Sequence, residues 1–286
     1  MKGLEQAGSY IFVTMVIVTI FTSAALAQDL KTEEIVAKHL ESIGTKEKRE
    51  EINNRLAMGA SSFESKLPSK KTGGKALIVS DGTNLYFIAS LASKEYPYEK
   101  IGYFNEKISL PFVTSGTRSP LGAFIAEHEK LLSDGLFTGS ISNTWALLNW
   151  QKNKALIKSA GTKKIDGRKV YVLEYFPKGV GSSEFSIRMF FDTENFRHVR
   201  TEYRHDIASK EDTFGRLGRQ AGVKMRLTED FGDFKDLDGM TLPHTYTLNY
   251  QTDSNSGTFE YIWGINLTQY MFNRKLDAGF FTFDVK

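Results

Sequence analysis

The sequence predicts an α+β fold in which one antiparallel sheet presents an apolar, ring-rich face beneath a cover of a few helices. Five successive segments in the C-terminal half alternate between apolar and polar residues, which is typical of strands with one buried face. Few segments have helical spacing, and those few must cover the apolar face. The chain has no cysteine and 21 phenylalanines, so a large core and not disulfides must stabilise it.

The N-terminus is typical of a secretory signal peptide. An apolar run at 10–21 precedes Ala25, Leu26 and Ala27, and it is shorter than the roughly 20 residues that a spanning helix needs. We therefore predict cleavage after Ala27, a soluble periplasmic protein, and one domain at 28–286. An uncleaved membrane anchor is the alternative. The net charge of +3 is too small to indicate a nucleic-acid partner.

The mature chain is predicted to begin with a helix at 32–44, capped by Thr32 and ended by Gly44. A charged, solvated helical stretch follows at 45–54. Beyond it, apolar residues recur at every second position, which predicts strands and a hairpin with its turn at Asp81-Gly82.

A helical insert is predicted at about 107–158. Ser119 and Pro120 are typical of a helix start, and the apolar residues that follow, through Leu132, share one face. A second short helical stretch contains Trp145. The residues predicted to form the lid over the sheet are Leu121, Phe124, Ile125 and Trp145. His128 lies on the same stripe and is interpreted as a packed residue at the edge of the core.

The five alternating strands give the predicted inner face of the sheet. Its residues are Phe185, Ile187, Met189, Phe191, Met225, Leu227, Tyr246, Leu248, Phe259, Tyr261 and Trp263. In one strand, Val199 and Tyr203 are predicted to face inward and His198 outward. The outward charges are interpreted as a cross-strand ladder, or alternatively as a docking patch for an anionic headgroup or a partner protein. These charges are Arg188, Arg200, Glu202, Arg204, Lys224 and Arg226.

The stretch EDFGDFKDLDG at 229–239 holds five acids in its first ten residues. A calcium loop of the EF-hand type needs a bidentate glutamate where Thr245 stands, and a kinase would need a glycine-rich phosphate loop that is absent. We therefore interpret Asp238-Gly239 as a hairpin turn and the acids as solvated turn residues.

Four segments resemble the outer-membrane lipoprotein-sorting, or LolA-like, superfamily. DFGDFKDLDGMTLPHTYTL is similar to that family's aromatic, aspartate and Gly-x-x-Leu-Pro segment. IDGRKVYVLEYFPK and SIRMFFDTENFRHVRTEYR are similar to its strand pairs, and EEIVAKHLESIG is similar to the N-terminal helix of its secreted members. The resemblance implies an incomplete β-barrel, a strongly curved sheet plugged by helices around an apolar cavity. The resemblance also implies a role as a carrier or sensor of lipids and lipoproteins. That role depends on no catalytic residue.

Hydrolase motifs are not found. The GxSxG nucleophile elbow is absent and the five histidines are scattered. Along one strand, His198 and Glu202 would lie about 13 Å apart, too far to share a zinc ion. The stretches EHE (127–129) and RHD (204–206) are interpreted as surface ion pairs. The sequence thus predicts no enzyme, no cofactor and no metal.

The predicted function is a non-enzymatic periplasmic binding protein. The inner face and lid residues named above would hold an acyl chain, a lipid or a lipoprotein between sheet and helices. Three alternatives stay open: a dry, filled core in place of the cavity, an interaction or signalling module on the same scaffold, and a periplasmic hydrolase with an unrecognised site.

Overall fold

The computed structural model describes residues 30–179, 185–207, 222–277 and 279–281. The predicted signal peptide and most of the polar loop after Ile207 lie outside these ranges. The helical elements are α1 (Thr32–Ile43), α2 (Lys46–Glu51), α3 (Pro120–Glu127), α4 (Lys130–Ser133), η1 (Gly139–Ile141) and η2 (Ala146–Leu148). The strands are β1 (Asn54–Lys66), β2 (Ser69–Asp81), β3 (Asn84–Ser90), β4 (Tyr98–Phe104), β5 (Lys107–Ser109), β6 (Leu156–Ile165), β7 (Arg168–Phe176), β8 (Phe185–Asp192), β9 (His198–Ile207), β10 (Val223–Leu237), β11 (Met240–Ser254) and β12 (Gly257–Phe272). Within the described ranges, no helix has both the length and the apolar character needed to cross a membrane.

All the strands belong to one twelve-stranded antiparallel sheet in the order β5-β4-β3-β2-β1-β12-β11-β10-β9-β8-β7-β6. Two meanders, β1 to β5 and β6 to β12, are joined because β1 pairs with β12. The order runs from edge to edge without closing, so β5 and β6 are its two edge strands. The predicted α+β fold with an incomplete barrel is confirmed.

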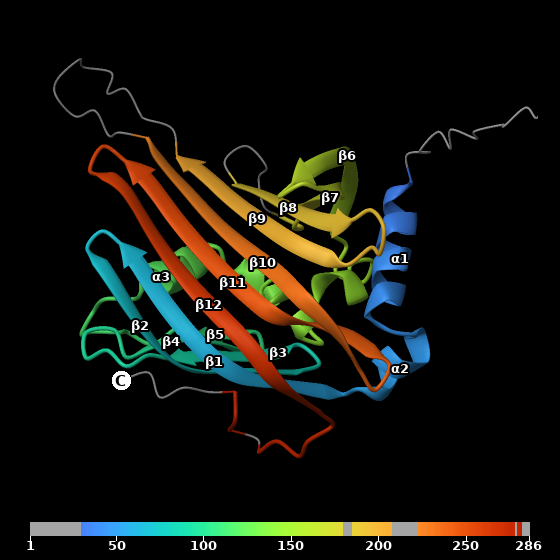
Figure 1. Ribbon diagram of the computed structural model, residues 1–286, viewed down its shortest axis with the longest axis horizontal. Coiled ribbons are helices and arrows are strands. Elements are labelled where there is room, and N and C mark those ends of the chain that lie inside the picture. Colours follow the sequence, from blue (N-terminus) through green and yellow to red (C-terminus); the bar gives the residue numbers. More distant parts are fainter. Residues whose placement is uncertain (1–29, 180–184, 208–221, 278, 282–286) are drawn as a thin grey trace, which may run out of the picture.

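The connection between the two edge strands supplies most of the helical cover. Residues 110–155 leave β5 at one edge and reach β6 at the other, so this segment has to cross the sheet. In Figure 1 its green helices lie behind the long strands β10 to β12. The buried side chains of this segment and of the inner sheet face form one continuous core, which α1 completes from the side of β6 and β11.

Helix α1 buries Ile35, Val36 and Ile43, and α2 has no buried residue. Both helices were predicted, and Gly44 ends the first one as expected. The cap differs from the prediction: Lys31 takes the N-cap position and Thr32 is the first helical residue.

Helix α3 begins as predicted, with the Ser119 hydroxyl accepting a hydrogen bond from the Gly122 N–H (2.8 Å). The expectation of one long helix through Leu132 is wrong. The chain leaves the helix at His128, whose φ of −124° and ψ of 58° are not helical, and α4 starts two residues later. The break turns the two short helices without exposing either apolar face, since Leu121, Ile125, Leu131 and Leu132 all stay buried.

The acid-rich stretch is the end of β10 and a tight hairpin. Asp238 and Gly239, with φ of 52° and 80°, connect the paired residues Leu237 and Met240, as the turn interpretation predicted. The interpretation of all the acids as solvated is wrong for Glu229, which is 0% exposed in the core.

Strand β9 differs from the predicted alternation at its start. The β8 to β9 register passes from Phe190 opposite Arg200 to Phe191 opposite His198, so Val199 is an extra residue, a β-bulge. The bulge reverses the direction of the side chains before it. His198 is therefore buried in the core, contrary to the prediction, and Val199 packs on the outer face beside Val170 and Phe190.

The outer face carries the predicted cross-strand ion pairs in part. Arg188 pairs with Glu174 on β7 (2.9 Å), and Arg200 pairs with Asp230 on β10 (2.5 Å). Arg204 instead pairs with Glu202 of its own strand (2.7 Å).

Replacing Arg200 and Arg204 together with serine is expected to leave the fold intact and to lower the free energy of unfolding by no more than about 2 kcal/mol. Partly exposed ion pairs each contribute roughly 0.2 to 1 kcal/mol, because water screens the charges. Urea unfolding followed by circular dichroism measures the change. Loss of the folded state would contradict the assignment of both residues to the surface.

Candidate functional site

The predicted inner-face residues do face one common interior. Seven of them are at most 2% exposed: Ile187, Met189, Phe191, Leu227, Tyr246, Leu248 and Trp263. The lid residues Leu121, Phe124, Ile125 and Trp145 are buried to the same degree and belong to the same core cluster. Sheet and lid therefore pack directly against each other at these positions.

The other four inner-face residues lie nearer the surface. Phe185, Met225 and Tyr261 are half-buried and pack against the core cluster, and Phe259 is half-buried near the start of β12. Phe185 also lies in contact with Phe124 of α3, with ring centroids 6.4 Å apart.

Buried hydrogen bonds that the sequence did not predict attach the cover to the sheet. The first group centres on His39 of α1, whose Nδ1 donates to the Phe196 carbonyl (3.0 Å) while its Nε2 accepts from Trp145 Nε1 (2.9 Å). Trp145 stacks on His198 of β9, with centroids 4.7 Å apart. Burial is the main cause that lowers the pKa of His39 to about 4, so this imidazole is neutral near pH 7.

The second group centres on Glu229 of β10. Its carboxylate accepts hydrogen bonds from the Thr138 N–H (2.9 Å), the Tyr203 hydroxyl (2.6 Å) and the Tyr246 hydroxyl. Burial raises the pKa of Glu229 to about 7, against the opposing effect of these three donors. Glu229 thus joins the loop before η1 to three neighbouring strands.

The third group holds the start of α3. Glu99 of β4 accepts hydrogen bonds from the N-cap hydroxyl of Ser119 (2.7 Å) and from the Tyr96 hydroxyl, and Tyr96 in turn accepts from Trp263 Nε1 (3.0 Å). Burial raises the pKa of Glu99 to about 7 as well. The start of α3 is therefore fixed to β4 and β12, whereas its other end lies beside a pocket.

That pocket has a volume of about 460 Å³ and opens between the end of α3, α4 and the β4 to β5 hairpin. Its apolar lining consists of Tyr103, Ile108, Ala126 and Phe185. The volume is within the range of roughly 300 to 1,000 Å³ that is typical of small-molecule sites. Of the predicted inner-face residues, Phe185 is the one that lines this pocket.

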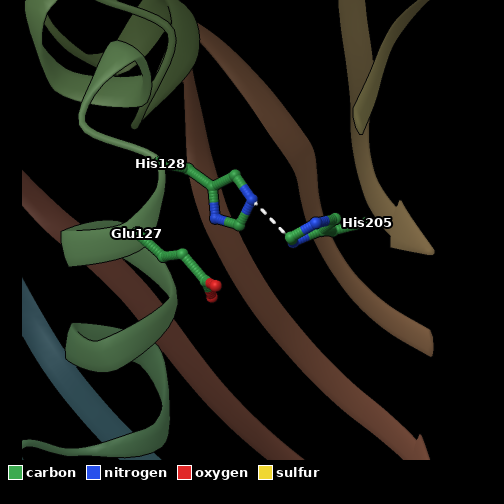
Figure 2. Close-up of side chains that lie close together, drawn as sticks. All are labelled: Glu127, His128 and His205. Atoms are coloured by element: carbon green, nitrogen blue, oxygen red, sulfur yellow. Dashed lines mark hydrogen bonds between the residues drawn. The ribbon is translucent and has the colours of Figure 1, made fainter. Parts of the chain in front are cut away.

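Three side chains at the same place could ligate a metal ion. Glu127, His128 and His205 each offer a ligand atom, and these atoms lie within 4.8 Å of one another. Figure 2 shows the two imidazole rings in contact, with Nε2 of His128 3.0 Å from Nδ1 of His205, and the Glu127 carboxylate on the same side. Burial is the main cause that lowers the pKa of His128.

The interpretation of EHE and RHD as two separate surface ion pairs is wrong for their histidines. His128 and His205 are half-buried and hydrogen-bonded to each other across 77 residues of sequence. One part of this contact was available from the sequence, because an inward Tyr203 places His205 inward too. What the sequence did not contain was the position of α3 above β9.

No protein-family model and no curated protein matches the chain. Among solved structures, it is similar to a LolA superfamily protein of Nitrosomonas europaea, with 16% identity and a TM-score of 0.43 over 89% of this chain and 99% of that one. It is similar to a DUF1329 family protein of Desulfovibrio piger, with 11% identity and a TM-score of 0.43 over 87% and 96% of the two chains. A lipoprotein-sorting protein domain of Vibrio parahaemolyticus has 15% identity and a TM-score of 0.41 over 86% and 97%.

An open twelve-stranded antiparallel sheet, covered on its inner face by the segment that joins its two edges, is the architecture that the motifs implied. The open antiparallel sheet with a helical cover, predicted from the sequence, is therefore confirmed.

Proposed function

We propose that this chain is a non-enzymatic periplasmic protein that binds an acyl chain, as a free lipid or as part of a lipoprotein, and acts as a carrier or sensor. The observation that carries the proposal is the pocket of about 460 Å³ at the end of α3. Phe185 lines it and begins the inward row of β8 that continues with Ile187 and Met189.

The apolar part of the pocket suits a chain of methylene groups, and its charged residues lie at the rim. Ile108, Ala126 and Phe185 offer apolar surface, and each methylene that leaves water contributes about 0.8 kcal/mol. Transfer from a membrane or from another carrier exchanges one apolar environment for another, so release costs little. In this proposal the seven fully buried inner-face residues, which include Ile187 and Trp263, lie deeper than the pocket and support it. The ligand reaches them only if the end of α3 moves.

A second candidate function is an interaction module with a filled core. The observation that favours it is the complete burial of the seven deep inner-face residues against the lid. Such a module would form a stable complex with another envelope protein in a pull-down and would take up no lipid.

Native mass spectrometry of protein purified without detergent from an envelope fraction tests the proposal. We expect a bound lipid, a mature chain that begins at Gln28, and uptake of added palmitate after delipidation. Aspartate at Ile187 or Trp263 would be uninformative, because a charge at a fully buried site unfolds the chain.

Ala126→Phe is the informative variant, since it fills the pocket from a partly exposed helical position. We expect palmitate binding to weaken by about 10-fold or more, the equivalent of losing two buried methylenes. Leu67→Ser, at an apolar residue that is 57% exposed in the β1 to β2 turn, is the matched control and should bind as the wild type does. A wild-type chain that takes up no lipid, or an Ala126→Phe chain that binds normally, would overturn the proposal.

A further inference from the structure

The rim of the pocket contains a cluster of metal-ligating side chains that an acyl-binding role does not use. We propose that Glu127, His128 and His205 bind one divalent transition-metal ion of the zinc class, which joins the end of α3 to strand β9. This inference is independent of the proposed lipid ligand, because it rests on the cluster alone.

His128 is already oriented as a ligand. Its Nδ1 lies 2.8 Å from the carbonyl oxygen of Phe124. A carbonyl can only accept, so Nδ1 carries the proton and the lone pair of the neutral ring is on Nε2. Metal-binding histidines are commonly held in this way, with the second ring nitrogen donating to a carbonyl or a carboxylate.

Aromatic contacts fix the plane of the same ring. Phe185 stacks on His128 with centroids 4.3 Å apart and planes inclined by 23°, and Phe124 contacts it at 4.4 Å. A ring held by a hydrogen bond and two aromatic neighbours loses little freedom when it binds a metal ion.

His205 comes from the sheet and is placed by strand pairing. It lies directly opposite Phe185 in the β8 to β9 ladder, and its Nδ1 is 3.0 Å from Nε2 of His128. Without metal, this Nδ1 donates its proton to the Nε2 lone pair of His128. Metal binding requires the other neutral tautomer of His205, with the proton on Nε2 and the lone pair on Nδ1. Zinc to nitrogen distances of about 2.0 to 2.1 Å would give an N–Zn–N angle of about 95° at that separation. A tetrahedral site would need the two nitrogens to separate by about 0.3 Å more, a small change for two half-buried rings.

Glu127 completes a set of two imidazoles and one carboxylate. It is the last residue of α3, adjacent to His128, and its side chain is exposed, so water can fill the remaining coordination positions. The same pocket is lined by Glu106 and Glu129 against a single cation, Lys130, and this excess of negative charge attracts a cation.

The donor set selects the class of ion. Imidazole nitrogens suit zinc, copper, nickel and iron, whereas calcium and magnesium prefer sites built of oxygen. Two nitrogens and one carboxylate oxygen from the described residues therefore favour a zinc-class ion. Because α3 and β9 both supply ligands, bound metal would hold the free end of α3 against the sheet.

Isothermal titration of the mature, tag-free chain with Zn²⁺ tests the site. We expect one ion per chain, a higher Tm in Zn²⁺, and no competition from excess Mg²⁺ or Ca²⁺. His205→Gln and Glu127→Gln should each weaken Zn²⁺ binding. For His205→Gln the affinity for Zn²⁺ should fall by more than 100-fold. A loss of up to about 100-fold is typical when the residue removed only forms a hydrogen bond to a metal ligand.

Glu194→Gln is the matched control, because it makes the same change at an exposed acid of the β8 to β9 turn that belongs neither to the cluster nor to the pocket. It should bind Zn²⁺ as the wild type does. The exposed position of Glu127 ensures that at least one ligand variant folds, and circular dichroism verifies each of them. The absorption spectrum of bound Co²⁺, with its visible bands lost in His205→Gln, reports nitrogen ligation directly.

Three results would overturn the inference. They are a wild-type chain that binds no Zn²⁺, binding that survives both His205→Gln and Glu127→Gln, or displacement of Zn²⁺ by Mg²⁺ at equal concentration. Palmitate binding by delipidated protein is measured separately, so failure of one proposal leaves the other intact.

Discussion

Replacing Trp145 with alanine is expected to lower the free energy of unfolding by about 3 to 5 kcal/mol, the range for truncating a buried tryptophan. Trp145 is 0% exposed, stacks on His198 and donates a hydrogen bond to His39. The variant would leave a cavity between the cover and the sheet and an unpaired Nε2 on a buried histidine. Urea unfolding followed by the circular dichroism of the backbone, which does not require the tryptophan side chain, measures the loss.

Two further variants separate the causes. Trp145→Phe keeps a stacked ring but removes the donor, so it should cost about 1 to 3 kcal/mol, the penalty for one unsatisfied buried polar atom. Trp150→Ala removes the same side chain from a half-buried position in the same segment and should cost less than Trp145→Ala. Equal losses at Trp145 and Trp150 would contradict the role of Trp145 as the attachment of the cover.

Replacing Glu229 with glutamine is expected to stabilise the chain at pH 8 but not at pH 4.5. The pKa of Glu229 is raised from 4.5 to about 7 because the carboxylate is buried. Between these two values the folded state keeps a proton that the unfolded state releases, so stability falls as the pH rises. A difference of 2.5 pKa units, from 4.5 to about 7, corresponds to roughly 3 kcal/mol at 1.36 kcal/mol per unit.

Glutamine has the shape of the protonated glutamate and cannot ionise. The free energy of unfolding of Glu229→Gln should therefore be close to that of the wild type at pH 4.5 and about 3 kcal/mol higher at pH 8. The quantity to measure is the difference between the two proteins. The pKa of His39, lowered to about 4, produces an opposite trend in each of them, since stability is lost as the pH falls below 6.5. That contribution cancels in the difference.

An exposed residue gives the control for the pH experiment. For Glu194→Gln, in the β8 to β9 turn, the difference in free energy of unfolding from the wild type should stay constant from pH 4.5 to 8. If this difference were also constant for Glu229→Gln, the carboxyl of Glu229 would have the same pKa in the folded and unfolded states. That result would contradict the buried, protonated state expected for Glu229 below pH 7.

Two predictions from the sequence failed, at His198 and at Glu229, for different reasons. The direction of His198 depends on a bulge at Val199, and a bulge depends on how β8 pairs with β9, not on the residues of β9 alone. The alternation rule therefore held for β8 and for β10 to β12 and failed at one end of β9. Glu229 was misplaced differently: an acid near a turn is normally solvated, and only three donors from distant segments make its burial tolerable.

Each candidate site also has a part that the sequence predicted and a part that it did not. Phe185 was placed correctly on the inner face, but whether that face lines a pocket or a packed core depended on where the cover lies. The pairing of His128 with His205 required both the break after α3 and the parity of β9.

Local structure could be predicted from the residues alone: the alternation that gives the sheet its apolar face, the Asp238-Gly239 hairpin, and the start of α3 at Ser119. Each of these depends on side-chain period, on turn chemistry or on a cap within a few residues of chain. The path of the segment that joins β5 to β6 across the inner face, which brings Glu127 and His128 to His205, could not be predicted in this way. Contacts between residues so far apart depend on strand order and register, which no local pattern contains.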